Sequence, residues 1–414
     1  MPPSPQPIFS RYGAIWSSVG DFLSRFDRRV AVNVAFLVPH IALRLEVMGW
    51  ADHPASAGEI DKMKQLMAEG MQQGAVGFST GLDYFPARYS NTEELVEICK
   101  VVAEYGGISV WHMRTHDLGL IEAIREVLQV GEQTRVPVHI SHFSTRGQEY
   151  RGKSGEMLAL VDEARAKGID VTFDSYPYLA TSTMMTLLLP GWVHAGGPDA
   201  ILERLGQAAI RERLCSELSS APLKWEHLYI TSISTEKNKV YQGKHLVEAA
   251  TMAGKEVPEF ILDLLLEESL EVSYLYVIGN EEDVQRIMRH PCHMAGSDGL
   301  LIGDKPNPRG WGTFPRYLGV YSRELNVLSL EETIRHITSS PAQRLGLTDR
   351  GLVKEGLTAD LVVFDPQTII DKATYSEPRQ FPLGIDYVLV NGEIVVAKGK
   401  HTGVLAGRAL PRCN

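Results

Sequence analysis

The sequences ISVWH (residues 108–112) and VPVHISH (residues 136–142) decide the fold. In each of them, an apolar run typical of a β-strand leads into a histidine. The sequence CHMAGSD (residues 292–298) repeats this pattern with an aspartate at its end. His112 and His142 lie 30 residues apart, about the length of one strand–helix–strand unit. We therefore expect their strands to be neighbours and both imidazoles to reach one point.

Strand-like runs alternate with helical patterns over most of the chain. Ser56 to Gly74 is predicted as a helix with a capping box at Ser56 and Glu59, and Asn91 is predicted to cap a helix over Thr92 to Tyr105. Apolar strands that alternate with helices indicate a parallel sheet covered by helices. Polar side chains at strand ends favour a (β/α) barrel over a doubly wound sheet. No Gly-x-Gly-x-x-Gly follows a strand, so a dinucleotide-binding fold is not supported.

The chain is predicted to hold a barrel over residues 1–350 and a small β-sandwich module over residues 351–414. Within the barrel, the alternation breaks over about residues 179–270, which we interpret as an insertion. The barrel pattern is predicted to resume with a strand over Val272 to Ile278. In the module, Asn391-Gly392 is a hairpin turn signal between two strand-like runs.

Composition is that of an ordinary globular enzyme. The chain has 414 residues, 44% of them hydrophobic and 22% charged, with a net charge of −10. The acidic balance argues against nucleic acid or an anionic membrane as partner, and no apolar run approaches the ~18 residues that a membrane span needs. The start, Met1 to Pro7, shows no signal pattern, and four cysteines make no disulfide framework, so we expect a cytoplasmic protein.

His112 and His142 are the candidate metal ligands, because neutral imidazole binds zinc well. A single strand histidine is more often a core residue, but its repetition at successive strand ends favours the metal site. His139 lies three residues before His142, so strand alternation predicts that it faces the other way and is structural. Asp298 could take a proton from a metal-bound water and give it to a leaving amine, although Asp298-Gly299 is also a turn signal.

Three further residues follow strand ends. Arg309 lies in the loop after the Asp298 strand and suits bidentate binding of a carboxylate; the alternative is a surface arginine. Tyr84 and Tyr176 also lie just after strand ends, where position alone favours a packing role over contact with a substrate.

Taken together, seven motifs resemble those of the N-acyl-D-amino-acid deacylase (D-aminoacylase) family of the amidohydrolase superfamily, over nearly the whole chain. They are GAVGFSTGLDY (74–84), HMR (112–114), HISH (139–142), YPY (176–178), GSDG (296–299), GTFPR (312–316) and GLVKEGLTADL (351–361).

The resemblance implies a zinc-dependent hydrolase of N-acyl-D-amino acids with a metal-dependent-hydrolase (β/α)8 TIM barrel and a small-molecule substrate. His112 and His142 match the histidine ligands of the fifth and sixth strands, and Asp298 matches the general acid/base after the eighth. Arg309 and Tyr84 match residues that hold the substrate's free carboxylate, and Tyr176 matches another contact.

The chain also departs from the family pattern. The family begins with a β segment, a His-x-His motif on barrel strand one and a metal-binding cysteine after strand two, whereas the histidines before His112 are His40 and His53. We therefore expect an N-terminally truncated barrel without those two strands, that thiolate and half of the β module. Ser144 stands where the family usually has lysine, which weakens substrate-carboxylate binding or alters the preferred side chain.

Two alternatives to an active deacylase stay open. One is a catalytically impaired or inactive fragment that keeps the fold but binds metal poorly. The other is a cyclic amidase of the dihydroorotase or hydantoinase kind. Arg309 and Tyr84 favour an N-acyl amino acid over a ring, because they supply a carboxylate clamp. The oligomeric state is not predicted.

Overall fold

The computed structural model describes residues 17–147 and 150–411; Met1 to Pro7, where no signal pattern is found, lie outside them. The main sheet is parallel and six-stranded, in the order β1-β2-β3-β4-β5-β9. Successive parallel strands joined by helices are the pattern of the predicted (β/α) barrel. The strands are β1 (Leu37–Pro39), β2 (Gly77–Gly81), β3 (Ile108–His112), β4 (Val138–Ile140), β5 (Val171–Ser175) and β9 (His293–Ala295).

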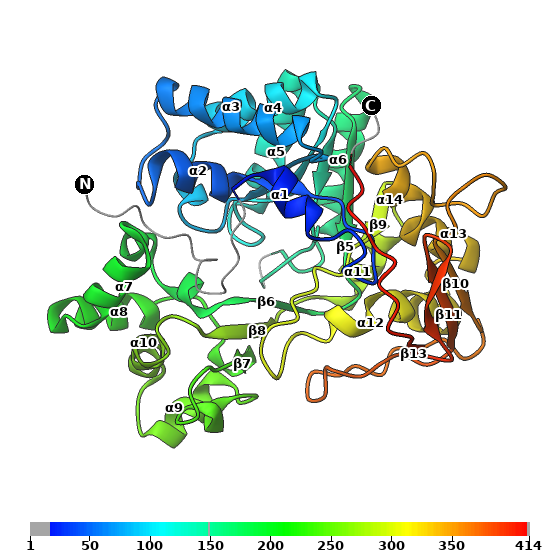
Figure 1. Ribbon diagram of the computed structural model, residues 1–414. Coiled ribbons are helices and arrows are strands. Elements are labelled where there is room, and N and C mark those ends of the chain that lie inside the picture. Colours follow the sequence, from blue (N-terminus) through cyan, green and yellow to red (C-terminus); the bar gives the residue numbers. More distant parts are fainter. Residues whose placement is uncertain (1–16, 148–149, 412–414) are drawn as a thin grey trace.

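Helices that follow these strands pack side by side, and α2 to α5 gather on one side of the sheet in Figure 1. The predicted capping box is confirmed, because the Glu59 carboxylate accepts a hydrogen bond from the Ser56 amide at 2.8 Å. Asn91 Oδ1 caps the next helix by accepting from the Glu94 amide at 3.0 Å. The helices are α1 (Val19–Ser24), α2 (His40–Met48), α3 (Ala57–Gln72), α4 (Thr92–Glu104), α5 (Leu120–Thr134), α6 (Ser154–Ala166), α11 (Glu281–Met288), α12 (Arg309–Arg316), α13 (Leu330–Ile337) and α14 (Ser339–Arg344).

Short helical turns complete the barrel and its connections. They are the 3-10 helices η2 (Ala87–Tyr89), η3 (Met185–Leu188), η4 (Gly191–His194), η5 (Trp225–His227) and η6 (Lys239–Tyr241), and the π-helix η7 (Tyr317–Glu324).

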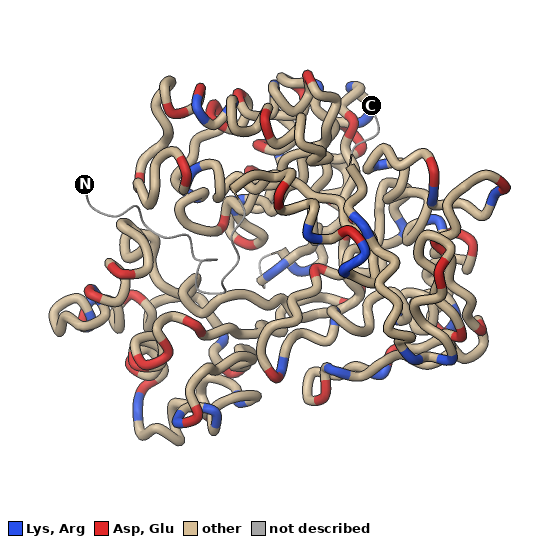
Figure 2. The backbone as a smooth tube through the Cα atoms, in the orientation of Figure 1, with Lys and Arg blue, Asp and Glu red and all other residues tan. Residues whose placement is uncertain are grey.

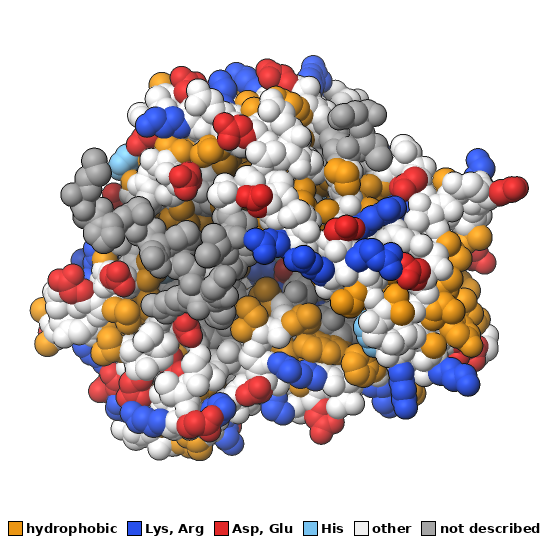
Figure 3. Space-filling model, in the orientation of Figure 1, with side chains coloured by type: hydrophobic (Ala, Val, Ile, Leu, Met, Phe, Trp, Pro, Cys, Tyr) orange, Lys and Arg blue, Asp and Glu red, His pale blue; other side chains and the backbone are white. Residues whose placement is uncertain are grey.

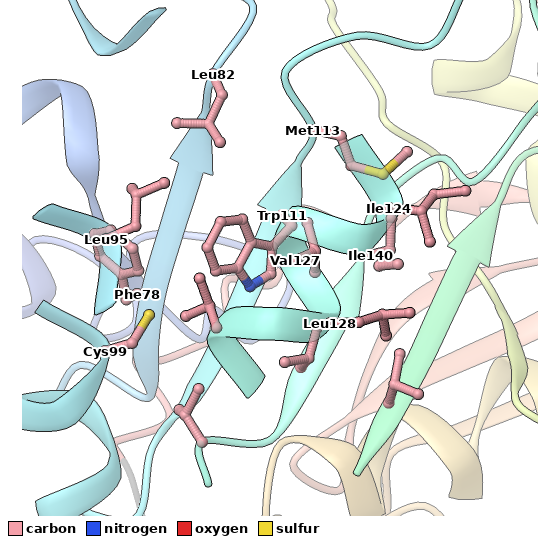
Figure 4. Packing of buried hydrophobic residues seen from close by; sticks show 14 of the residues in the cluster. Phe78, Leu82, Leu95, Cys99, Trp111, Met113, Ile124, Val127, Leu128 and Ile140 are labelled. Atoms are coloured by element: carbon pink, nitrogen blue, oxygen red, sulfur yellow. The ribbon is translucent and has the colours of Figure 1, made fainter. Parts of the chain in front are cut away.

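The barrel core lies between the sheet and its helices, and Trp111 is the largest side chain in it (Figure 4). Its indole packs in one cluster with Phe78, Leu95 and Val127, and its Nε1 donates to Ser109 Oγ at 2.9 Å. Because side chains alternate along a strand, a Trp111 that faces the helices turns His112 to the inside of the barrel.

The insertion is a separate unit with its own sheet and core. Its antiparallel strands run in the order β6-β8-β7. They are β6 (Ala180–Met184), β7 (Leu228–Ser232) and β8 (Ser273–Val277), and the helices around them are α7 (Gly197–Leu205), α8 (Ala208–Ser219), α9 (Leu246–Ala253) and α10 (Val257–Glu267). The prediction that the barrel resumes at Val272 to Ile278 is therefore wrong, because β8 pairs with β6 and β7. An apolar run marks a strand, but it does not specify the partner.

The C-terminal module is an antiparallel sheet in the order β10-β11-β12-β13. Its strands are β10 (Leu361–Phe364), β11 (Ile385–Val390), β12 (Glu393–Ala397) and β13 (Lys400–His401). The predicted hairpin turn is confirmed: Asn391 and Gly392, with φ of 51° and 83°, lie between the paired strands β11 and β12. Residues near the C-terminal end of the chain return to the N-terminal region, where Val34 and Ala409 form a parallel bridge.

Acidic and basic residues are interspersed along the backbone of barrel, insertion and module (Figure 2). Hydrophobic side chains gather over the C-terminal module at the right of Figure 3, and in that module Val362 and Val363 are 54% and 48% exposed. Among the described residues, no helix combines the length and the apolar composition needed to cross a membrane.

Replacing Trp111 with alanine tests the core contact that orients β3. We expect Trp111→Ala to lower the free energy of unfolding by about 3–5 kcal/mol, because it leaves a large cavity behind the His112 strand. Urea unfolding followed by circular dichroism measures the change. The matched control is Phe381→Ala, whose ring is 77% exposed and which should cost less than about 0.5 kcal/mol. A cost below about 1 kcal/mol for Trp111→Ala would contradict this account of the core.

Candidate active site

His112 and His142 lie close together inside the barrel. His112 is the last residue of β3, and His142 follows the end of β4, whose Ile140 is in register with Trp111. The His112 Nδ1 and His142 Nε2 atoms lie 2.9 Å apart. The expectation from their spacing, that both rings reach one point, is met by the structure.

His142 reaches this point because the backbone leaves the strand conformation. Its φ of +39° lies in the left-handed region, which residues with a side chain rarely adopt. Asp174, at the end of β5, fixes the bend, since its Oδ1 accepts a hydrogen bond from the His142 amide at 2.7 Å.

The prediction for His139 is wrong in its direction. Val138 and Ile140 pack in the helix-facing core, so His139 between them faces the barrel interior. Its Nε2 lies 2.9 Å from Asp174 Oδ2, and Asp174 thereby links His139 to the His142 backbone. Strand alternation does not separate the two histidines, because the left-handed bend at His142 interrupts it.

A third imidazole, missed by the sequence analysis, completes the cluster. His116 Nε2 lies 3.1 Å from His142 Nδ1, and its ring is 3% exposed. Burial, together with the positive charge of Arg146, holds the pKa of His116 well below its usual value, and burial does the same for His142. The neutral rings that result are the form in which imidazole binds metal. The signal in the sequence that could have identified His116 is its position four residues after His112, just beyond the end of β3.

The facing nitrogens suit a shared metal ion. On a tetrahedral zinc ion with ligands at 2.0–2.1 Å, two nitrogens would stand about 3.4 Å apart, close to the separation here. His116 fits this arrangement, because a hydrogen bond to His142 Nδ1 leaves the Nε2 lone pair free toward His112. His112 Nε2 is buried without a hydrogen-bond partner among the described residues and lies 4.0 Å from Asp83 Oδ2. A group of three or more His, Cys, Asp or Glu side chains able to hold a metal is not found in the described ranges, so the site offers this pair as a partial set.

Asp298 and Arg309 form a second group at the end of β9. Arg309 Nη2 lies 2.7 Å from Asp298 Oδ2, and the Arg309 side chain is 1% exposed. Its guanidinium carbon stands 4.5 Å from the centre of the Tyr176 ring, which fixes the plane of the guanidinium. Arg309 Nε and Nη1 are buried without a partner among the described residues. In the arginine predicted to bind a carboxylate, Nη2 is therefore paired with Asp298, and Nε and Nη1 are the donors without a partner among the described residues.

The carboxyl of Asp298 is shifted toward its protonated form. Burial raises the pKa of Asp298, the negative charge of Asp174 adds to this rise, and Arg309 opposes it. The side chain remains 38% exposed, so solvent moderates these effects. Asp298 also has a left-handed backbone, with φ of +45°.

Tyr84 and Ser144 are placed beside the histidines. The Tyr84 ring centre is 4.9 Å from that of His112, and its hydroxyl pairs with Thr183 Oγ1 at 3.0 Å, so the insertion contributes to the site. Ser144 Oγ donates to the His142 carbonyl at 3.0 Å. The predicted clamp of Arg309 and Tyr84 is thus divided between two groups, since Tyr84 contacts the histidines and Arg309 contacts Asp298.

Comparison with known proteins identifies the family. The sequence pattern described as the amidohydrolase family matches residues 15–396. D-aminoacylase of Alcaligenes xylosoxydans xylosoxydans is 36% identical over 414 residues, which cover 99% of this chain and 77% of that protein. The chain belongs to the amidohydrolase family. N-acyl-D-glutamate deacylase of the same organism is 35% identical over 365 residues, covering 88% of this amidohydrolase and 67% of the relative.

Solved structures agree with this membership. A crystal structure of D-aminoacylase superposes with a TM-score of 0.81 at 36% identity and covers 96% of this chain and 76% of its own. N-acyl-D-glutamate deacylase from Bordetella bronchiseptica, complexed with zinc and a phosphonate mimic of the tetrahedral intermediate, gives 0.81 at 32% identity, with coverage of 96% and 76%. The predicted family and the barrel fold are confirmed. D-hydantoinase, at 14% identity and a TM-score of 0.53, shares the fold alone.

Removing the charge of Arg309 tests the electrostatics of Asp298. We expect Arg309→Gln to raise the pKa of Asp298 further above its usual value, because the guanidinium favours the ionised carboxylate. As the solution is acidified, the Asp298 carboxylate then takes up its proton at a higher pH than in the wild type. Carbon-13 NMR titration of labelled aspartates measures the midpoint, with Asp298→Asn to assign the signal.

The matched control is Arg88→Gln, because Arg88 pairs with Asp83 at 3.1 Å and not with Asp298. An Asp298 midpoint that stays in place or falls in Arg309→Gln would contradict the pairing.

Proposed function

We propose that the chain is a zinc-dependent hydrolase that cleaves N-acyl-D-amino acids to a carboxylate and a free D-amino acid. The observation that carries the proposal is the facing His112 and His142 pair at the ends of neighbouring strands, in a chain 36% identical to D-aminoacylase over nearly its whole length. The relatives act on N-acyl-D-amino acids by name, and one was solved with zinc.

His112 Nδ1 and His142 Nε2 would hold the metal, with Tyr84 packed against His112 and His116 bonded to His142. A zinc ion bound there supplies an activated water and polarises the acyl carbonyl. His116 keeps the proton on His142 Nδ1 and so leaves the facing nitrogen unprotonated.

Asp298 is the proposed general acid/base. Its raised pKa brings the carboxyl closer to the pH at which a proton is both accepted and returned. In the proposed reaction the carboxylate accepts the proton of the attacking water and delivers it to the departing amide nitrogen. Arg309 keeps Asp298 in place through the 2.7 Å ion pair.

Arg309 is also the proposed anchor for the free carboxylate of the substrate. Its Nε and Nη1 are buried without a partner among the described residues, and they are the donors proposed for the substrate carboxylate while Nη2 stays on Asp298. Tyr176, beneath the guanidinium, and Ser144, beside His142, complete the proposed substrate contacts.

The second candidate is a catalytically impaired or inactive protein that keeps the fold. It is favoured by the ligand set itself, because catalytic zinc normally has three protein ligands and the structure assembles a pair of imidazoles. The two candidates differ in metal content and turnover, which one experiment measures.

Metal analysis and turnover on the purified chain test the proposal. We expect close to one equivalent of zinc and cleavage of N-acetyl-D-amino acids but not of their L isomers. Asp298→Asn should lower kcat by about 10²- to 10⁴-fold with zinc retained, because the proton carrier is lost while the imidazole pair stays. Less than about a tenth of an equivalent of zinc with no cleavage of any N-acetyl-D-amino acid would support the inactive alternative and overturn the proposal.

The contact between His116 and His142 gives a separate test. We expect His116→Ala to weaken zinc binding about 10- to 100-fold, because the partner that orients His142 is removed. Competition with a chromogenic chelator measures the affinity. His401→Ala, on the exposed strand β13, is the control and should bind zinc as the wild type does. Equal affinity of the His116→Ala and wild-type proteins would contradict the positioning role of His116.

A further inference from the structure

Arg146 is a cation beside the site that the proposed reaction does not use. It follows His142 by four residues, and its amide donates to the His116 carbonyl at 3.1 Å, so the loop backbone is tied to the histidine cluster. The side chain is half-buried and makes no hydrogen bond, ion pair or ring contact within the described residues. A half-buried guanidinium without a partner has its donors available for a ligand.

The charge of Arg146 acts on both groups of the site. Burial raises the pKa of Tyr84 and of Asp298, and the positive charge of Arg146 opposes the rise in both. Arg146 also lines one pocket with His142, Ser144, Ser175 and Tyr176, which holds about 440 Å³ of empty space including its open mouth. A substrate that is held at His142 and extends into this pocket would therefore meet Arg146.

Among the described residues that line this pocket, none forms an ion pair with Arg146. Asp283 also lines it, but its carboxylate accepts hydrogen bonds from Thr145 Oγ1 at 2.9 Å, the Gly152 amide at 2.7 Å and the Ser154 amide at 3.2 Å. Asp283 is 2% exposed and its bonds lie within the protein. Asp298, on which the charge of Arg146 also acts, is paired with Arg309.

The two arginines therefore have different tasks. Arg309 pairs with the Asp298 carboxylate, and its Nε and Nη1, without a partner among the described residues, are the proposed donors to the α-carboxylate of the substrate. Ser144 is short and uncharged, and its hydroxyl is bonded to the His142 carbonyl, so it leaves the path to Arg146 open. A second negative charge on the substrate would meet Arg146 without breaking a side-chain hydrogen bond or ion pair within residues 17–147 and 150–411.

We propose that Arg146 binds a second carboxylate and makes this chain selective for N-acyl derivatives of acidic D-amino acids, aspartate or glutamate. This inference rests on the proposed function and adds the substrate class. A charge-assisted hydrogen bond at such a partly buried position corresponds to a preference of about 10- to 100-fold.

The test compares substrates that differ only in that charge. The zinc-loaded full chain is assayed for kcat/KM, and for binding by calorimetry, with N-acetyl-D-glutamate against N-acetyl-D-glutamine and with N-acetyl-D-aspartate against N-acetyl-D-asparagine. We expect one acid to be preferred over its amide at least 10-fold. Arg146→Met should reduce that preference about 10- to 100-fold, and Arg146→Lys should retain part of it. Arg125→Met, at an exposed position on α5, is the control and should keep the preference.

The outcomes separate the two proposals. Equal affinity of the wild type for acid and amide would overturn the role of Arg146. An equal loss of affinity for acid and amide in Arg146→Met would also overturn it, because Arg146 would then bind the α-carboxylate that both substrates share. A binding preference that depends on Arg146, with no turnover of any substrate, would support this inference and overturn the proposed function alone.

Discussion

The hydrogen bond from the His142 amide to the Asp174 carboxylate is the contact on which the site depends. It holds a histidine in a left-handed conformation that the backbone would otherwise leave, and so turns the imidazole toward His112. Asp174 Oδ2 lies 2.9 Å from His139 Nε2, so His139, inside the barrel, holds the carboxylate that stabilises the bend at His142. Gly296 permits this arrangement, because a Cβ there would stand 2.7 Å from Asp174 Oδ1. Residues on or just after the three strands β4, β5 and β9 thus fix the position of the His142 imidazole.

The parts of this arrangement that depend on periodicity were predictable from the sequence. Apolar runs and a 30-residue spacing placed His112 and His142 on neighbouring parallel strands, and the motifs identified the family. The direction of His139 and the role of His116 were not predictable, because they depend on a single left-handed residue and on contacts across the barrel. The pairing of Arg309 with Asp298 is likewise tertiary. The strand at 273–277 was placed in the wrong sheet, because alternation of apolar residues identifies a strand and not its partner.

Charge divides the site into regions with different tasks. In the histidine cluster, burial lowers the pKa of His116 and of His142 and so favours their neutral rings. The charges of Asp298 and Arg309 balance each other while the Asp298 carboxylate is ionised. Arg146 has no ion-pair partner among the described residues, and we propose that it selects a second negative charge on the substrate. The insertion takes part as well, since Thr183 on β6 holds the hydroxyl of Tyr84 beside His112.

The central claim is that His112 and His142 hold the metal ion at which the amide is cleaved. Its most direct test is the visible absorption spectrum of the cobalt-loaded chain, recorded for the wild type and for His112→Ala and His142→Ala. The account predicts d–d bands of a low-symmetry, imidazole-bound cobalt ion in the wild type, lost in both variants together with turnover. Bands that persist unchanged in either variant would contradict it.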